Sequence, residues 1–181
     1  LSQDGRLYWI VDAYTVTDRY PYSEKVRGIG NYIRNSVKVV VDAYHGSPTF
    51  YVTEDGAPII QTYGKIFPGI FKPISGMPQD LKNHIRYPQD LFAVQARIYS
   101  TYHMTDPQVF YNKEDLWKIP EKNFGTHVQR MAPYYTIMKL ATIGRQEEFI
   151  LMVPFTPARK ENMIAWMASR CDAPNYGKLL V

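Results

Sequence analysis

The chain has 181 residues, of which 45% are hydrophobic and 21% are charged, a balance typical of a folded globular domain and unlike that of a disordered chain. Its single cysteine, Cys171, excludes an internal disulfide and a cysteine-based zinc site. The net charge is only +4, which is modest for a nucleic-acid-binding surface, and we expect no nucleic-acid partner.

The two ends of the chain indicate that it is part of something longer. It begins with Leu1 rather than Met, and the apolar run at residues 179–181 reaches its last position. No stretch approaches the roughly 18 consecutive apolar residues that would span a bilayer. We therefore expect residues 1–181 to be a single soluble domain, or a fragment of one, from a larger protein whose targeting information lies elsewhere.

The first third of the chain predicts strands. Residues 6–17 are rich in aromatic and β-branched residues on both faces, which predicts a strand in the centre of a sheet. Residues 19–35 contain two glycines and no clear period, which is typical of a long loop or a short helix. Strands at 37–44 and 49–54 flank a His-Gly-Ser-Pro turn, and together they predict a hairpin.

The middle of the chain predicts helices, because proline recurs where helices would begin and its missing N–H costs nothing there. These prolines are Pro58, Pro78, Pro88, Pro107 and Pro157. After Pro58, one apolar helical face is formed by Ile59, Tyr63, Ile66 and Phe67. After Pro88, a longer helix has Leu91, Val94, Ile98 and Tyr102 along one side. Residues 121–133 have no period and predict a mobile loop.

The last third predicts a second hairpin and a last helix. Strands at 134–142 and 147–155 flank Gly144, and a helix is expected from residues 156–157 to about Arg170, before a final strand at 176–181. Helices are grouped in the middle of the chain, with one near the C-terminus, rather than alternating with strands. This order predicts an α+β fold with a mainly antiparallel sheet.

A basic, tyrosine-rich window is the clearest functional feature. Between Arg19 and Lys38 five cations face a single acid, Glu24, so this window carries the whole net charge. Cations mixed with tyrosines bind anionic or sugar-like groups, although the same mixture is found at ordinary domain interfaces and in solvated loops. The candidate binding residues are Arg19, Tyr20, Tyr22, Arg27, Tyr32 and Arg34. Within the window, residues 28–30 resemble half of a phosphate loop and predict only a flexible turn.

Two aspartates and a histidine are the candidate catalytic residues. The tetrapeptide Val-Asp-Ala-Tyr occurs at 11–14 and at 41–44, so Asp12 and Asp42 occupy matching places on two predicted strands, with His45 close behind. Carboxylates that share a cleft have pKa values that move apart, which suits acid–base chemistry. The alternative is that both are ordinary turn or cap residues. No two histidines have ligand spacing, and we predict no metal site and no cofactor.

Several strings in the chain are long and idiosyncratic, and together they resemble the bacterial uncharacterised protein family (UPF) 0182. They are residues 4–10, 12–14, 20–23, 31–38, 41–44, 66–69, 86–92, 154–157 and 176–179. The resemblance covers nearly the whole chain and is poorest at 121–133. It implies that the chain is part of the soluble region of a large multi-pass membrane protein of the cell membrane, on the side outside the cytoplasm. It implies no reaction, ligand or cofactor.

Three hypotheses follow for the function. The first is an extracytoplasmic domain that binds an anionic ligand or a protein partner through the basic window, linked to the membrane by the rest of its parent protein. The second is an enzyme acting on envelope lipids or polymers through Asp12, Asp42 and His45. The third is a structural part of a transporter-like assembly. The missing catalytic motifs favour the first.

Overall fold

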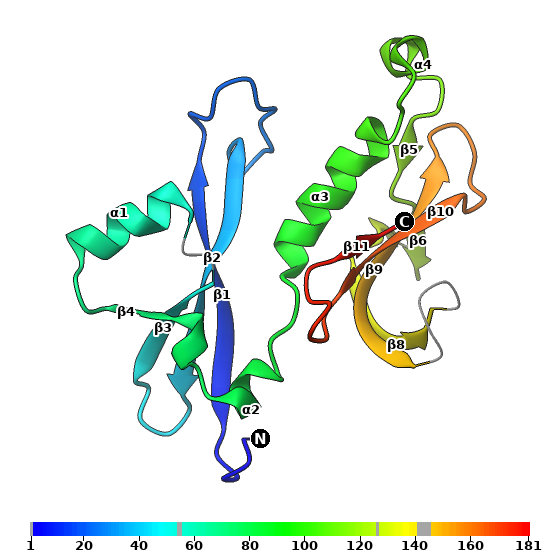
Figure 1. Cartoon of the computed structure of the whole chain (residues 1–181). Coiled ribbons are helices and arrows are strands. Elements are labelled where there is room, and N and C mark those ends of the chain that lie inside the picture. The colour runs from blue at the N-terminus through cyan, green and yellow to red at the C-terminus, as the bar shows by residue number, and fades with distance from the viewer. Residues whose placement is uncertain (1, 54–55, 126, 141–145) are drawn as a thin grey trace. The chain divides into compact units, whose positions relative to one another are not determined.

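The computed structural model describes residues 2–53, 56–125, 127–140 and 146–181, and it divides the chain into two compact units (Figure 1). Unit 1 is Leu1–Ile85 and unit 2 is Arg86–Val181. The sheets are mainly antiparallel and the helices lie mostly in the middle of the chain, so the predicted α+β class is confirmed. The single-domain organisation stays a prediction.

Unit 1 is a four-stranded sheet with short helices on both faces. Its elements are β1 (Tyr8–Thr17), β2 (Tyr32–Asp42), β3 (Pro48–Val52), α1 (Pro58–Ile66), β4 (Phe71–Pro73), the 3-10 turn η1 (Ile74–Gly76) and α2 (Gln79–Lys82). The strand order is β1-β2-β3-β4, and only the β3–β4 pair is parallel. The predicted hairpin of β2 and β3 is confirmed.

The core of unit 1 forms on the two faces of this sheet. On one face Ala57 and Ile60, at the start of α1, pack around Val37. On the other face Met77 and Leu81 pack against Val40 and Tyr51. Burying apolar side chains on both faces is what holds a sheet of this size together.

Unit 2 is built around one long strand. Its elements are α3 (Gln89–Tyr102), α4 (Pro107–Asn112), β5 (Trp117–Lys118), β6 (Glu121–Phe124), β7 (His127–Arg130), β8 (Tyr134–Lys139), β9 (Glu147–Pro157), β10 (Ala165–Arg170) and β11 (Leu179–Leu180). The order β11-β10-β9-β5 forms the main sheet, β8 also pairs with β9, and β6 and β7 form a separate ribbon. The predicted β8–β9 hairpin is confirmed, although Gly144 lies outside the described residues.

The helix α3 covers one face of the unit 2 sheet. Phe92 and Ala96 are fully buried and pack against Leu151, Val153 and Phe155, which alternate along β9. The predicted helix is confirmed, and its predicted apolar side is partly right. Val94 is buried and Leu91 packs against the core, whereas Ile98 and Tyr102 are exposed. The opposite sheet face packs Leu140, Ile150, Met152 and Ala168 together.

Three sequence predictions are wrong for identifiable reasons. The last helix does not exist: Ala165–Arg170 is strand β10, antiparallel to β9 and mostly buried, so it lacks the alternation that marks a half-exposed strand. The predicted mobile loop at 121–133 contains the β6–β7 hairpin, whose described side chains are exposed and also show no alternation. The strand β1 is apolar on both faces, yet it lies at the edge of its sheet rather than in the centre.

Candidate functional site

The loop that joins β1 to β2, residues 18–31, is tied together by its own hydrogen bonds, and we call it the tyrosine loop (the blue segment after β1 in Figure 1). Asn31 forms the clamp. Its Nδ2 donates to the carbonyls of Tyr20 (2.7 Å) and Ser23 (3.2 Å), and its Oδ1 accepts from the Tyr20 N–H (3.0 Å). Ser23 Oγ donates back to the Asn31 carbonyl at 2.7 Å. The loop is therefore held in one conformation by contacts between its two ends.

Gly30 closes the tyrosine loop at a point where only glycine fits. Its φ is +107°, and a Cβ placed there would stand 2.5 Å from the Thr17 carbonyl oxygen. Val26 and Gly30 exchange backbone hydrogen bonds of 2.7 and 3.0 Å. The turn predicted at residues 28–30 is thus present. It is shaped by this close backbone approach, which the sequence alone did not reveal.

The tyrosines of the window have two different environments. The rings of Tyr20 and Tyr32 stack at a centroid separation of 5.5 Å, which links the loop to the first residue of β2. Tyr22 instead projects fully into solvent, with its backbone in the left-handed region at φ 60°. Left-handed backbone costs about 1 kcal/mol for a residue other than glycine, and a fully solvated ring returns nothing to the fold. Strain of this kind is a feature of functional loops.

The exposed cations of the window lie on the tyrosine loop and at the start of β2. Arg19 and Arg27 are exposed, and their side chains make no ion pair or hydrogen bond to any residue that the structure describes. Lys25 stands 3.7 Å from Asp18 in a solvated pair. Arg34 is exposed on β2, opposite Thr15 in the strand register, and has contacts of its own. The structure therefore gathers the predicted binding residues along one loop and one strand start.

The sequence analysis counted Lys38 among the cations of the basic window, but the structure buries it. Its side chain is only 2% exposed, and Nζ forms an ion pair with Asp12 on the neighbouring strand. A buried, paired cation adds nothing to the surface charge. Of the exposed cations, Lys25 is paired with Asp18 and Arg34 has contacts of its own, which leaves Arg19 and Arg27 as the candidates to contact a ligand.

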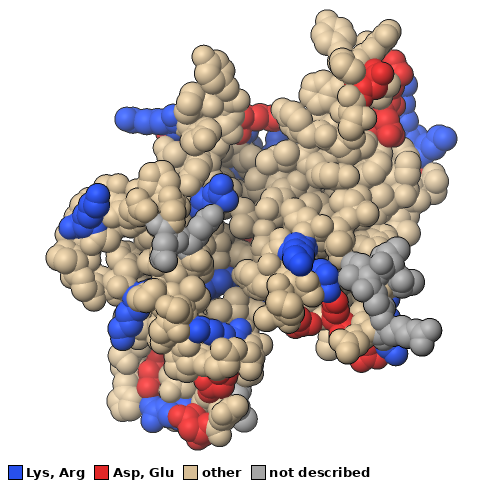
Figure 2. All heavy atoms as spheres, in the orientation of Figure 1, with Lys and Arg blue, Asp and Glu red and all other residues tan. Residues whose placement is uncertain are grey.

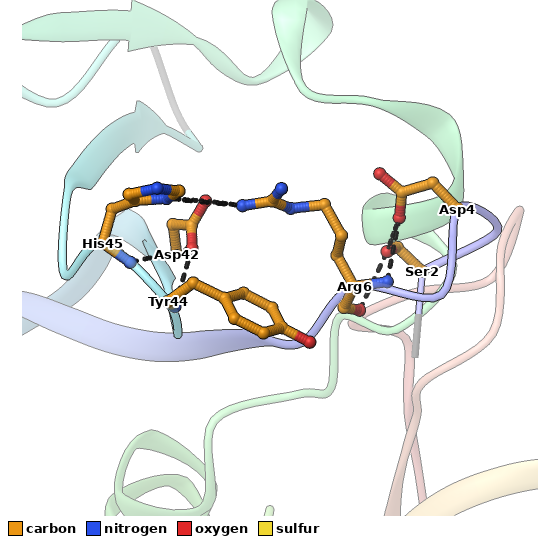
Figure 3. A network of polar contacts seen from close by, with 6 residues as sticks. All are labelled: Ser2, Asp4, Arg6, Asp42, Tyr44 and His45. Atoms are coloured by element: carbon orange, nitrogen blue, oxygen red, sulfur yellow. Dashed lines mark hydrogen bonds and ion pairs between the residues drawn. The ribbon is translucent and has the colours of Figure 1, made fainter.

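The second candidate site surrounds Asp42, at the end of β2 (Figure 3). Asp42 Oδ1 accepts from the N–H groups of Tyr44 (2.8 Å) and His45 (3.2 Å), while Arg6 Nη2 donates to Oδ2 at 2.6 Å. The N–H of Tyr44 and then the Arg6 guanidinium hold the pKa of Asp42 well below its usual range. His45 Nδ1 stands 3.4 Å from Asp42 Oδ2, and the Arg6 guanidinium lies over the Tyr44 ring at 5.0 Å.

The structure brings Asp42 and His45 together but leaves Asp12 apart from both. In the β1–β2 register Asp12 is opposite Lys38 and Asp42 is opposite Tyr8, four residues further along. At about 3.4 Å per residue, the Cα atoms of Asp12 and Asp42 are separated by roughly 14 Å along the strands. Each faces its own cation, Lys38 or Arg6. The geometry around Asp42 is that of a carboxylate locking a turn, and a catalytic role for Asp12, Asp42 or His45 stays a prediction.

His103 in unit 2 is one of four lone histidines in the sequence, and the structure gives it a specific place. Its ring stacks on Trp117 at a centroid distance of 3.8 Å, and Nδ1 lies 3.0 Å from the Tyr99 carbonyl. Nε2 lies 3.5 Å from Asp115 Oδ2. Tyr99 and His103 are four residues apart, which puts them on one helix face. This spacing is the sequence feature that could have predicted their contact. Within the described ranges, no three His, Cys, Asp or Glu residues cluster in a way that would hold a metal ion.

The chain matches a known protein family over its whole length. The model of the uncharacterised protein family UPF0182 matches residues 1–181, which is every position. The chain belongs to this family. The resemblance argued from the sequence strings is therefore confirmed, and the UPF0182 relatives show how long the proteins of this family are.

Relatives from distant organisms match over the full chain. UPF0182 proteins of Sulfurovum sp. and Microcystis aeruginosa are 56% and 58% identical to it, over 100% and 99% of its length. The UPF0182 protein of Pelotomaculum thermopropionicum is 55% identical over 99%. These stretches are only 20%, 19% and 20% of the respective relatives. The chain thus spans about a fifth of the UPF0182 proteins that it matches.

Two further findings concern structure. No solved structure matches the chain significantly. Among the helices within the described ranges, none is both long enough and apolar enough to cross a bilayer.

Proposed function

We propose that this UPF0182 segment is a binding domain of a larger membrane protein, located outside the cytoplasm, and that its tyrosine loop binds an anionic group on a ligand or partner. Membership in a family of proteins about five times as long supports a role as one region of a larger machine. The membrane location is carried over from the resemblance set out above.

The observation that carries the proposal is Tyr22 on its pre-formed loop. The left-handed backbone at Tyr22 raises the free energy of the folded chain, and the fully solvated ring does not offset this cost by burial. The Asn31 clamp and Gly30 hold this arrangement in the free protein. A loop ordered in advance loses less conformational entropy on binding, which strengthens binding without further contacts.

The chemistry of the loop fits an oxyanion presented next to a flat or hydroxylated surface. The guanidinium groups of Arg19 and Arg27 donate two parallel hydrogen bonds to a carboxylate, phosphate or sulfate. Tyr22 offers a ring face for stacking and a hydroxyl for hydrogen bonding. A lipid headgroup, an acidic glycan and an acidic protein segment all present this combination.

Charge reversal at the loop tests the proposal. The variant Arg19→Glu/Arg27→Glu is titrated against three soluble probes: a sulfated glycan fragment, polyglutamate and glycerol 1-phosphate, which is the headgroup of phosphatidylglycerol. For the probe that binds the unaltered chain, we expect at least about 100-fold weaker binding, since a charged hydrogen bond contributes about 1.5–3 kcal/mol. The matched control, Arg159→Glu/Lys160→Glu, makes the same charge change at exposed positions of unit 2 and leaves binding within about twofold.

Two results would contradict the proposal. The unaltered chain binds none of the three anionic probes, or the control variant weakens binding as much as the loop variant does. The second result would mean that net charge, rather than the tyrosine loop, is responsible for binding.

The 3.4 Å approach of His45 to Asp42 supports a second candidate, an enzyme acting on envelope lipids or polymers. A carboxylate orients an imidazole for general base catalysis, although here Arg6 shares the same carboxylate oxygen. The variant His45→Gln keeps Asp42 and its turn intact. Hydrolysis of an envelope lipid or glycan that is lost in this variant would favour the enzyme. If the chain neither binds nor hydrolyses, the structural role in a transporter-like assembly is the one supported.

A further inference from the structure

The helix α1 has an apolar face that the fold leaves uncovered. The sequence predicts one face from Ile59, Tyr63, Ile66 and Phe67, and such a face normally packs on the core. The structure instead buries Ile60, while Tyr63, Ile66, Phe67 and Ile70 remain 46–57% exposed. We call these four residues the α1 patch. Exposed apolar clusters of this kind mark contact surfaces.

The α1 patch is held in a fixed position from both ends. On one side Ala57 and Ile60 are buried in the unit 1 core. On the other side Phe71 begins β4, pairs with Phe50 on β3, and packs its ring against the Phe50 ring at 6.1 Å. Between them the chain turns at Gly69, with φ +83°, which carries Ile70 round beside the end of the helix. The exposed side chains are thus presented by an anchored helix–turn.

The segment that carries the α1 patch is basic, and it follows two acidic residues, Glu54 and Asp55, in the sequence. From residue 56 to residue 79 the chain has no acidic residue, and its only charged side chains are Lys65 and Lys72, both exposed. Figure 2 shows basic side chains at the left edge of the view, where α1 lies. An apolar, partly aromatic surface with two exposed lysines on the same segment is complementary to an apolar surface that carries negative charge.

We propose that the α1 patch docks on an anionic lipid surface. Tyr63, Ile66, Phe67 and Ile70 insert at the boundary between headgroups and acyl chains, and Lys65 and Lys72 contact the lipid phosphates. This inference goes beyond the binding assigned to the tyrosine loop and uses none of its residues. A protein partner is the other possible occupant, but two exposed lysines without an acidic residue between positions 56 and 79 favour a uniformly negative partner.

Vesicle flotation tests the proposal with the 181-residue chain itself. The unaltered chain should float with mixed phosphatidylglycerol–phosphatidylcholine vesicles and only weakly with pure phosphatidylcholine. The variant Ile66→Asp/Phe67→Asp should float at least about tenfold less, because two apolar contacts are lost and two repelling charges are added. The variant Lys65→Gln/Lys72→Gln should lose about fivefold per charge on the mixed vesicles.

The matched control is Met163→Asp/Ile164→Asp, which adds two acids at a neighbouring pair of residues in unit 2 with similar exposure. It should float like the unaltered chain. Circular dichroism spectra and melting temperatures show whether each variant remains folded. Flotation of Ile66→Asp/Phe67→Asp at the unaltered level, or no flotation of the unaltered chain, overturns the proposal and leaves the tyrosine-loop assignment standing.

A second measurement avoids substitution by charge. The native Cys171 is buried, so a cysteine introduced as Ile70→Cys is labelled selectively with an environment-sensitive NBD fluorophore. We expect a blue shift and a several-fold increase in emission on adding phosphatidylglycerol vesicles, and no change for the same label at Ile164→Cys. An unchanged spectrum at position 70 contradicts the proposal even if the chain floats.

Discussion

The two units of the chain bury different kinds of side chain. In unit 2 most residues without exposed area are apolar, among them Phe92, Leu151, Val153 and Phe155. In unit 1 the two least exposed residues are polar, Ser36 and Lys38. Both units leave large apolar side chains exposed, such as Trp9 in unit 1 and Ile137 in unit 2, so the units differ in what they bury rather than in how much apolar surface they expose.

Both proposed contacts fall on unit 1. Each unit does bury one cation against a carboxylate from a neighbouring strand, Lys38 with Asp12 and Arg170 with Glu148. The tyrosine loop and the α1 patch of unit 1 each combine exposed aromatic side chains with exposed cations. Surfaces with this composition are typical of binding sites rather than of scaffolds.

The largest effect is expected in the unit 2 core. Phe155→Ala removes a fully buried ring that packs against Tyr99 and Trp117, and should lower the free energy of unfolding by about 3–5 kcal/mol. Trp9→Ala removes a larger ring that is 67% exposed on unit 1, and should change it by no more than about 0.5 kcal/mol. Urea denaturation followed by circular dichroism measures both. Equal losses of unfolding free energy in the two variants would contradict the difference in burial between Phe155 and Trp9.

The next effect is expected at the buried ion pair of unit 1. Asp12→Ala leaves the Lys38 ammonium buried without its carboxylate, and should cost about 3 kcal/mol of unfolding free energy. Lys38→Met leaves Asp12, whose side chain is 31% exposed and can be hydrated, and should cost only about 1 kcal/mol. The same denaturation experiment ranks the two variants. A larger loss for Lys38→Met would show that Asp12, not Lys38, depends on the pair.

A smaller, local effect is expected at the two glycines of the tyrosine loop. Gly30→Ala places a methyl group against the Thr17 carbonyl and should strain the loop by about 1–3 kcal/mol. Gly28 also has a positive φ, but nothing lies within 4 Å of the position that an alanine methyl group would take, so Gly28→Ala should cost about 1 kcal/mol. Binding of the anionic probe should weaken more for Gly30→Ala. Equal binding by both variants would show that the shape of the loop does not determine binding of the anionic probe.

The smallest effect is expected at Asp42, at the exposed end of the sheet. Its pKa is lowered in the fold, so the ionised carboxylate stabilises the folded chain at pH values above its unfolded pKa of about 4. This contribution is lost as the pH falls through the still lower folded pKa. The gap in melting temperature between the unaltered chain and Asp42→Asn should therefore be full at neutral pH and narrow below about pH 4. A gap that widens in acid would contradict the assignment.

Local patterns predicted much of the fold. Four prolines mark helix starts as expected: α1 and α4 begin at Pro58 and Pro107, and α2 and α3 begin directly after Pro78 and Pro88. The fifth, Pro157, instead ends β9, because a proline at a strand end is tolerated as well as one at a helix start. The errors at β10 and at the β6–β7 hairpin share one cause. A strand that is buried on both faces, or exposed on both, has no alternating pattern.

The candidate site was predictable in composition but not in geometry. Arg19, Tyr20, Tyr22 and Arg27 were visible as a mixture of charge and aromatic rings. The burial of Lys38 depends on a carboxylate 26 residues away, and the loop conformation depends on Asn31 reaching back across it. At α1 the helical period was right and only the burial was wrong, because the period shows that a face is apolar without showing what covers it.

Hydrogen–deuterium exchange with and without the sulfated glycan fragment, at saturating concentration, tests the central claim most directly. We expect added protection from exchange across the tyrosine loop and the start of β2, residues 18–34, and unchanged exchange in unit 2. The same experiment with Arg19→Glu/Arg27→Glu should show no added protection. Protection confined to unit 2, or none in unit 1 despite measurable binding, would contradict the assignment of the binding site to this loop.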